Sequence, residues 1–169
     1  MLVVICGSST VSAVSSMNRM VSKLEDHFFN GNVEYKDNKS VYNDIVDKTE
    51  IATNLVSLSK EYVSASDSHI KAIQSAVNDI SSEKSIGKLY KLMKTLDSNV
   101  DWLLTELSGK NLSSTHKDLL IKYQSQYRSE TNTINSDNYN TLVREYNDEV
   151  SGFPGSIFKL FAHKAEYFE

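Results

Sequence analysis

The chain has 169 residues, a net charge of −4 and a pI near 5.6, and it contains six glycines and one proline. Because turns depend on glycine and proline, this scarcity argues against a fold of many short strands and favours long helices. The acidic balance and the dispersed lysines provide no basic stripe for phosphates, so we expect no nucleic-acid partner. The single cysteine, Cys6, excludes an intrachain disulfide and a metal site built from cysteines.

Residues 1–18 carry no charged side chain, and the first charges are Arg19 and Lys23. As a helix this segment would reach about 27 Å, just short of the ~30 Å hydrocarbon core of a bilayer. Its many serines make the segment a weak membrane span. The isoleucine before Cys6 does not suit a lipoprotein processing site, which requires a small residue at that position. Three interpretations stay open: a membrane anchor, complete or truncated at its front, a signal or lipoprotein segment, and a helix of a soluble protein.

The basic residues nearest the candidate span determine the orientation that we expect. Arg19 and Lys23 follow the segment, and no lysine or arginine precedes it. Basic residues beside a span tend to stay in the cytoplasm. We therefore expect a single-pass protein of the cell membrane whose remaining chain lies in the cytoplasm. An extracytoplasmic lipoprotein and a soluble cytoplasmic protein are the alternatives.

Helical periodicity is clear after this segment. A first helix is predicted at 10–29, and Gly31 suits its C-terminal cap. One long helix is predicted at 38–80, because no glycine or proline interrupts residues 32–86. Apolar residues recur there at steps of three and four, the spacing of one helix face. They are Val41, Ile45, Ala52, Leu55, Val56, Val63, Ile70, Ile73, Val77 and Ile80.

Two further apolar stripes follow. The first ends at Gly109, which is predicted as a left-handed cap, and consists of Leu89, Met93, Leu96, Val100, Leu103 and Leu107. The next helix is predicted to begin within 113–118, where a serine or threonine N-cap precedes an acid by three or four residues. Its stripe slips at 135–138, so either one kinked helix or two helices are expected. The last helical stretch is predicted to end at Gly152.

These segments predict an all-α fold. Amphipathic helices joined by short loops bury their stripes on one another. We expect an elongated antiparallel bundle of three to four long helices, followed by a short apolar helix that Pro154 begins. In this division residues 1–18 are the candidate anchor and residues 19–169 form the bundle.

The sequence offers no motif for catalysis or for metal binding. The four histidines lie on different segments without partners at metal-binding spacing, and no phosphate-binding loop or nucleophile motif occurs. The acidic residues Asp44, Asp47 and Glu50 are interpreted as solvated helix surface. We therefore expect no catalytic residue, no metal ligand, no cofactor and no small-molecule substrate.

The C-terminal stretch 139–169 carries a specific pattern of residue types. A helix with the spacing YN-x-x-V-R-x-YN leads into "FP", then into a short apolar segment and a terminal "YFE". In order, spacing and chain end, this stretch closely resembles the C-terminal signature of the LemA family. The matching residues are Tyr139, Asn140, Val143, Arg144, Tyr146, Asn147, Phe153, Pro154, Phe161, Tyr167, Phe168 and Glu169.

A second stretch, 51–62, is similar to another LemA segment, "LIPNLV" followed by K-x-Y. Asn54, Leu55, Val56, Lys60 and Tyr62 match, whereas Thr53 stands where the family has proline. The resemblance implies a membrane protein of bacterial type with a long helical bundle, no recognised catalytic activity and a poorly defined role. A non-enzymatic interaction or scaffold protein, attached to the membrane by its N-terminus, is thus the expected function. A soluble helical adaptor that lacks the anchor is the alternative.

The apolar segment after Gly152 is the candidate interaction patch. Its residues cover most of the circumference of a short helix, which is more than one core contact requires. They are Phe153, Pro154, Ile157, Phe158, Leu160 and Phe161. One interpretation is a lid on the end of the bundle, and the other is a patch for a membrane or for an unidentified protein partner.

Overall fold

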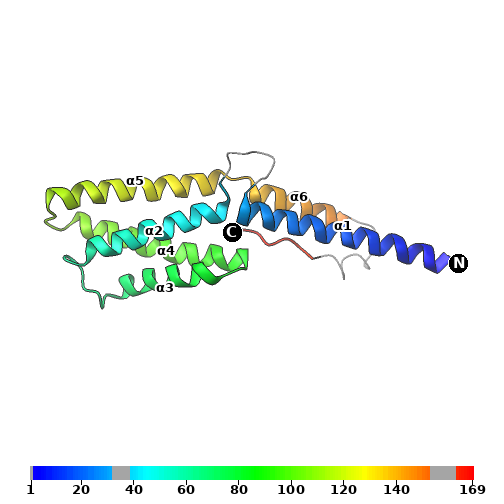
Figure 1. Ribbon diagram of the computed structural model, residues 1–169, viewed down its shortest axis with the longest axis horizontal. Coiled ribbons are helices and arrows are strands. Elements are labelled where there is room, and N and C mark those ends of the chain that lie inside the picture. Colours follow the sequence, from blue (N-terminus) through cyan, green and yellow to red (C-terminus); the bar gives the residue numbers. More distant parts are fainter. Residues whose placement is uncertain (1, 32–38, 153–162) are drawn as a thin grey trace. The chain divides into compact units, whose positions relative to one another are not determined.

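A computed structural model describes residues 2–31, 39–152 and 163–169, with the side chains of the first helix described from residue 14 onward. All the regular secondary structure in these ranges is α-helical, which confirms the all-α prediction (Figure 1). The six helices are α1 (Leu2–Asn30), α2 (Val41–Ser59), α3 (Ser68–Ser82), α4 (Ile86–Ser108), α5 (Ser114–Ser136) and α6 (Tyr139–Gly152).

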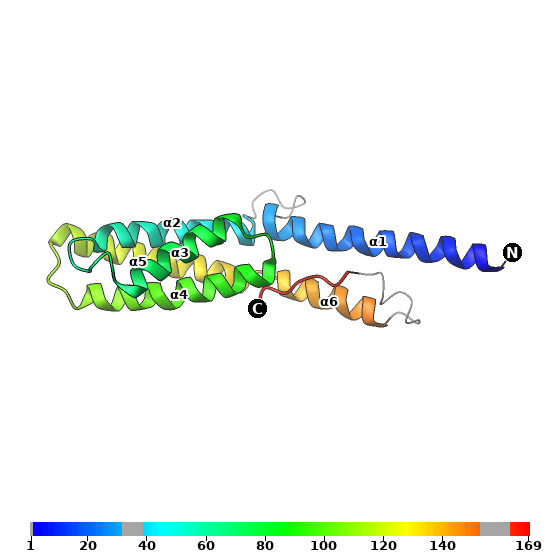
Figure 2. The ribbon, with the colours of Figure 1, turned by 90° about the horizontal axis from the view of Figure 1, so that it is seen from below.

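The chain divides into two units. The two-helix unit comprises Met1–Ser40 and Asn138–Tyr167, and the four-helix unit comprises Val41–Asp137 and Phe168–Glu169. In the four-helix unit α2, α3, α4 and α5 run alternately up and down and pack side by side, as an antiparallel bundle (Figures 1 and 2). The connections at 60–67, 83–85 and 109–113 are short, as expected between antiparallel neighbours.

The predicted stripe of α4 is the centre of this core. Leu89, Leu96, Val100, Leu103 and Leu107 are all 0% exposed. They face buried residues of α2 and α3 such as Ile45, Leu55, Ile73 and Ile80. The helical spacing of apolar residues thus identified the core of the four-helix unit correctly.

The prediction of one helix over 38–80 is wrong, because the chain turns at 60–67 between α2 and α3. The polar residues of this turn satisfy the backbone themselves. The Asp67 side chain caps α3 by accepting a hydrogen bond from the His69 N–H at 2.8 Å, and Ser64 Oγ accepts one from the Ser66 N–H at 3.3 Å. Serine and aspartate compete in this way with helical hydrogen bonds, and an unbroken apolar period does not reveal it.

Some helix ends have the conformation that the sequence predicts, and others do not. Gly31 has the predicted left-handed conformation, with φ 81°, and its N–H donates to the His27 carbonyl at 3.0 Å. Gly109 instead stays right-handed, with φ −82° and ψ −8°, because its N–H continues to bond carbonyls of the last turn of α4. Ser113 is the N-cap of α5 and accepts from the His116 N–H, without the reciprocal acid that was expected. At 135–138 two helices meet, with Asp137 in an extended conformation.

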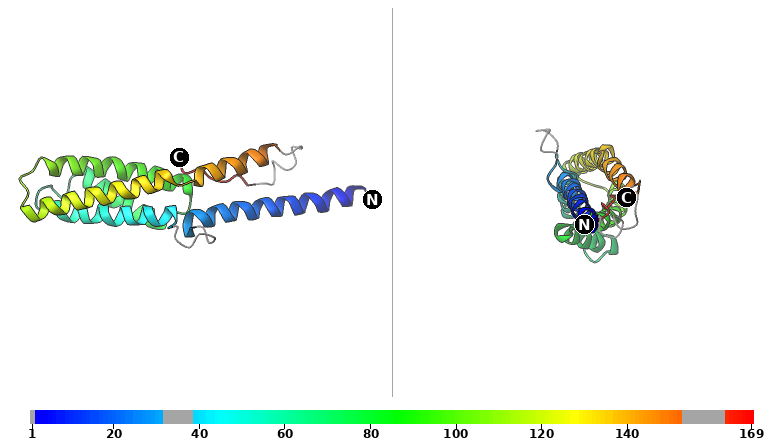
Figure 3. Two further views of the ribbon diagram at one scale, coloured as in Figure 1. Left: turned by 90° about the horizontal axis from the view of Figure 1, so that it is seen from above. Right: turned by 90° about the vertical axis from the view of Figure 1, so that its right-hand side faces the viewer.

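In the two-helix unit α1 packs along α6 (Figure 3). Phe28 of α1 is 0% exposed, and its ring lies 5.0 Å from that of Tyr139 on α6. Within residues 2–31, 39–152 and 163–169, none of the helices is both long enough and apolar enough to span a bilayer. The predicted apolar helix after Gly152 lies outside the described residues, and 163–169 are not helical.

Candidate functional site

A lysine lies in the core of the four-helix unit. Lys48 of α2 is 0% exposed, and its Nζ lies 2.6 Å from Oδ1 of Asp97 on α4. Tyr127 of α5 donates its hydroxyl hydrogen to the same Asp97 oxygen at 2.7 Å. The Lys48 Nζ also lies 4.5 Å from the centre of the Tyr127 ring. Three helices thus each contribute one side chain to what we call the buried network, Lys48, Asp97 and Tyr127.

Each contact in the buried network offsets the cost of removing charge from water. A buried ammonium is tolerated only when it is paired and hydrogen-bonded, and the Asp97 carboxylate and the Tyr127 ring face supply the compensation. Burial, and then the negative charges of Asp97 and Asp101, raise the pKa of Tyr127, so its hydroxyl stays a donor. Because solvent does not reach Lys48, this network positions the helices of the bundle and leaves its amine inaccessible to a substrate.

The sequence contained a signal for the buried network that periodicity did not use. Lys48 falls at the step that is missing between Ile45 and Ala52 on the α2 stripe. Tyr127, in contrast, belongs to the helical stripe that the sequence predicts here, midway between the buried residues Leu120 and Ile134 of α5. A charged residue in a core position predicts a buried partner, but the position of Asp97 on another helix could not be read from spacing.

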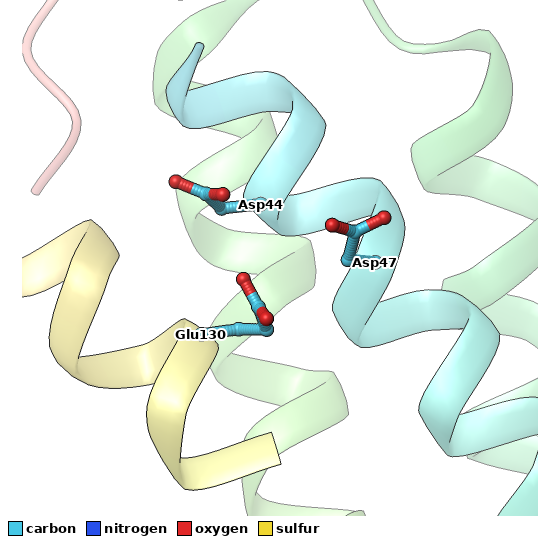
Figure 4. A group of neighbouring side chains, drawn as sticks. All are labelled: Asp44, Asp47 and Glu130. Carbon is cyan, nitrogen blue, oxygen red and sulfur yellow. The ribbon is translucent and has the colours of Figure 1, made fainter. Parts of the chain in front are cut away.

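Three carboxylates lie together beside this region, as Figure 4 shows. Asp44 and Asp47 belong to α2 and Glu130 to α5, and one oxygen of each lies within 4.8 Å of the others. Asp44 is only 3% exposed, so its interpretation as solvated surface is wrong, whereas Glu50 is exposed as predicted. Asp44 is buried because α5 packs against its face of α2. Carboxylate oxygens are ligands for hard cations such as Ca²⁺, but such groups also occur without an ion.

Two histidines of the four-helix unit pair with aromatic rings. His69 stacks on Trp102 with ring centres 4.1 Å apart, and its Nδ1 lies 2.8 Å from Oδ1 of Asn99. His116 Nδ1 lies 2.6 Å from the Tyr62 hydroxyl. Asn99 and Trp102 belong to α4 and His69 belongs to α3, so these half-buried side chains join two packed helices.

In the two-helix unit the C-terminal segment runs beside α6 (Figure 2), and side chains of α6 form hydrogen bonds with its backbone. Tyr139 donates to the Glu166 carbonyl at 2.8 Å, and Tyr146 donates to the His163 carbonyl at 3.0 Å. The Asn147 side chain donates to the Ala165 carbonyl at 3.2 Å and accepts from the Ala165 N–H at 3.1 Å. We call Tyr139, Tyr146 and Asn147 the α6 clamp.

The α6 clamp consists of three of the residues that carry the sequence resemblance. Of the others, Val143 is 0% exposed within the core of the two-helix unit, whereas Arg144 and Glu169 are exposed and Asn140 and Tyr167 are half-buried. Phe168 is buried in the four-helix unit, 5.3 Å from the Tyr90 ring. The candidate patch Phe153, Pro154, Ile157, Phe158, Leu160 and Phe161 lies outside the described residues.

A pocket of about 520 Å³ lies between α1 and α6. Its apolar lining comes from Met20, Leu24 and Leu142, and Tyr146 of the α6 clamp reaches it as well. The charged residues of its lining are Lys23, Asp26, Glu145 and Glu149. Three of these four are acidic, so the charge of the lining disfavours an anionic ligand.

Three tyrosines donate their hydroxyl groups to acceptors within the folded chain, and their ionisation tests whether these hydroxyls are buried as described above. Burial is the main cause that raises the pKa of Tyr127, Tyr139 and Tyr146, and nearby carboxylates add to it. Unfolded tyrosines ionise near pH 10, while these three stay neutral in the folded chain. Their stabilising contribution is therefore complete below about pH 10 and is lost as the pH rises further.

We expect an absorbance titration of phenolate to show fewer ionised tyrosines in the native protein near pH 10 than in urea, out of nine in the chain. The deficit should come from these three hydroxyls, each of which would be about half ionised at that pH in the denatured chain, and Tyr127→Phe should reduce it. Equal titration of native and denatured protein would contradict the burial of these hydroxyls.

Comparisons of the chain with protein-family models, with curated proteins and with solved structures give no match. The observations that bear on function are therefore the residue pattern of 139–169, the helical fold and the side-chain arrangements described above.

Proposed function

We propose that this chain is a non-enzymatic helical-bundle protein of the LemA type, which acts by interaction or as a scaffold and is held at a membrane by its N-terminus. The observation that carries the proposal is the signature over 139–169. That signature combines tyrosines and asparagines of one helix with the residues YFE at 167–169.

The arrangement of the two-helix unit supports this assignment. The α6 clamp binds the main chain of 163–166, so residues of the helical part of the signature hold the stretch that directly precedes the terminal YFE. This contact gives a physical reason why the spacing between the two parts of the signature matters. The resemblance over 51–62 adds Leu55 and Val56, which are both buried core residues of α2.

The membrane attachment in this proposal concerns residues 1–18. Residues 2–18 lie in α1, which continues without interruption to Asn30. The absence of charge before Arg19 is the supporting observation, and the basic residues Arg19 and Lys23 favour a cytoplasmic position for the rest of the chain.

The second candidate function is a soluble helical adaptor. Serines and a threonine in the segment 8–16 favour it, because hydroxyl groups lower the hydropathy of a span. Both candidates are interaction proteins, and they differ in whether a bilayer retains the chain.

Membrane fractionation of the full chain, produced in a bacterium, distinguishes these candidates. If the proposal holds, the protein floats with vesicles in a density gradient and stays with them through a carbonate wash. The double substitution Val3→Asp and Val4→Asp should release it, because carboxylates are costly in hydrocarbon. Ser22→Asp, at an exposed position of α1 beyond the segment, is the matched control and should stay bound. Wild-type protein that remains at the bottom of the gradient or in the soluble fraction would refute membrane attachment.

A further inference from the structure

The α6 clamp recognises main-chain groups of the C-terminal segment. Its contacts with this segment reach the carbonyls of His163, Ala165 and Glu166 and the N–H of Ala165. Asn147 is central, because its side-chain amide both donates to and accepts from one residue, as a neighbouring strand would. Every peptide offers these main-chain groups, so hydrogen bonding alone imposes no particular sequence.

The side chains of the segment add one size restriction. Ala165 is 5% exposed, whereas His163, Lys164 and Glu166 point into solvent. The position between the two Asn147 hydrogen bonds therefore requires a small side chain, and its flanking positions accept large polar ones. The site suits an extended peptide with alanine, or a similarly small residue, at its centre.

The bound segment covers the α6 clamp. While it is in place, Tyr139, Tyr146 and Asn147 are 2%, 4% and 8% exposed, and Tyr146 lies within hydrogen-bond distance of the Met17 carbonyl of α1, at 3.3 Å, as well as of the His163 carbonyl. Departure of the segment would uncover this surface and would remove the hydrogen bonds that the segment makes with Tyr139 and Asn147. An emptied clamp should therefore bind another extended segment that restores these hydrogen bonds.

We propose that the α6 clamp is a peptide-docking site whose partner in trans is the C-terminal segment of a second copy of this chain. The argument for this occupant is that the same segment within one chain already makes the four hydrogen bonds described above between the α6 clamp and residues 163–166. Covalent attachment gives the chain's own segment an effective concentration on the order of millimolar, so exchange between copies needs high local concentration or displacement of that segment. The inference rests on the proposed interaction role and is independent of membrane attachment.

A full-length Ala165→Trp variant tests the proposal. Indole is too large for the buried place of Ala165, so the variant should release its own segment and leave the clamp open. The probe is a fluorescent synthetic peptide with the sequence of residues 163–169, HKAEYFE. By fluorescence anisotropy we expect it to bind Ala165→Trp at least tenfold more tightly than wild type. Adding Asn147→Ala should reverse that gain.

Two controls test whether the expected effect depends on the buried place of Ala165. Lys164→Trp adds the same bulk at the exposed neighbour of Ala165, so this chain should keep its own segment bound and should bind the probe as weakly as wild type. A probe with tryptophan at the position of Ala165 should not bind any variant. Equal probe affinity for wild type and a folded Ala165→Trp chain would overturn the proposal.

Folding of the variant is checked by circular dichroism. If Ala165→Trp does not fold, Ala165→Pro provides the same comparison, because proline removes the N–H that donates to Asn147 and adds little volume. Loss of folding in both variants would show that the segment is an inseparable part of the core, and this too would overturn the proposal. None of these results depends on flotation of the chain with membranes.

Discussion

Replacement of Asp97 by alanine is expected to lower the free energy of unfolding by about 3–5 kcal/mol, the usual cost of removing one partner of a buried ion pair. The variant leaves the Lys48 ammonium, which is 0% exposed, without its carboxylate at 2.6 Å. It also removes the acceptor of the Tyr127 hydroxyl. Urea unfolding followed by circular dichroism measures the change.

Asp101→Ala is the matched control for this experiment. Asp101 lies one turn further along α4 and is exposed, so its removal should change stability by less than about 1 kcal/mol. The double variant Lys48→Met with Asp97→Leu should recover much of the loss, since apolar groups can replace a buried pair. An Asp97→Ala protein as stable as wild type would show that Asp97 does not offset the cost of burying the Lys48 charge.

Leu96→Asp is expected to prevent cooperative folding of the four-helix unit. Leu96 is 0% exposed at the centre of the α4 stripe, and an unpaired carboxylate at this position costs several kcal/mol, against a typical total stability of about 5–15 kcal/mol. Ile73→Asp, on the facing stripe of α3, should have the same effect, because Ile73 is 1% exposed.

Thr95→Asp provides the control, since it adds the same carboxylate to α4 one residue away on the exposed face. We expect this variant to unfold with nearly the wild-type midpoint by thermal circular dichroism. A normal thermal transition of Leu96→Asp would mean that the stripe from Leu89 to Leu107 is not the core.

The buried network and the α6 clamp have different consequences for function. The first lies where solvent cannot reach Lys48, so it fixes how α2, α4 and α5 pack. The second holds a segment of the chain by hydrogen bonds to its main chain, and we propose that the equivalent segment of a second copy can replace it. Of the two, the α6 clamp is therefore the arrangement on which our proposed interaction rests.

The sequence by itself determined the helical class and most of the core. Stripes such as Leu89 to Leu107 repeat at the period of a helix, and burying them requires helices to pack on one another. The left-handed Gly31 was also predictable, because glycine reaches that conformation without steric cost. Both inferences depend on interactions within a few residues of one another.

Tertiary structure alone decided the remaining features. The break at 60–67 depends on which of two local hydrogen-bonding schemes the packed bundle favours, and the apolar period runs through it unchanged. Lys48 and Asp97 are 49 residues apart in the chain, and Asn147 and Ala165 are 18 apart. Helical periodicity identifies the face on which a residue lies but not its partner on another segment. That choice of partner follows from the packing of whole helices, and therefore only the folded chain revealed the buried network and the α6 clamp.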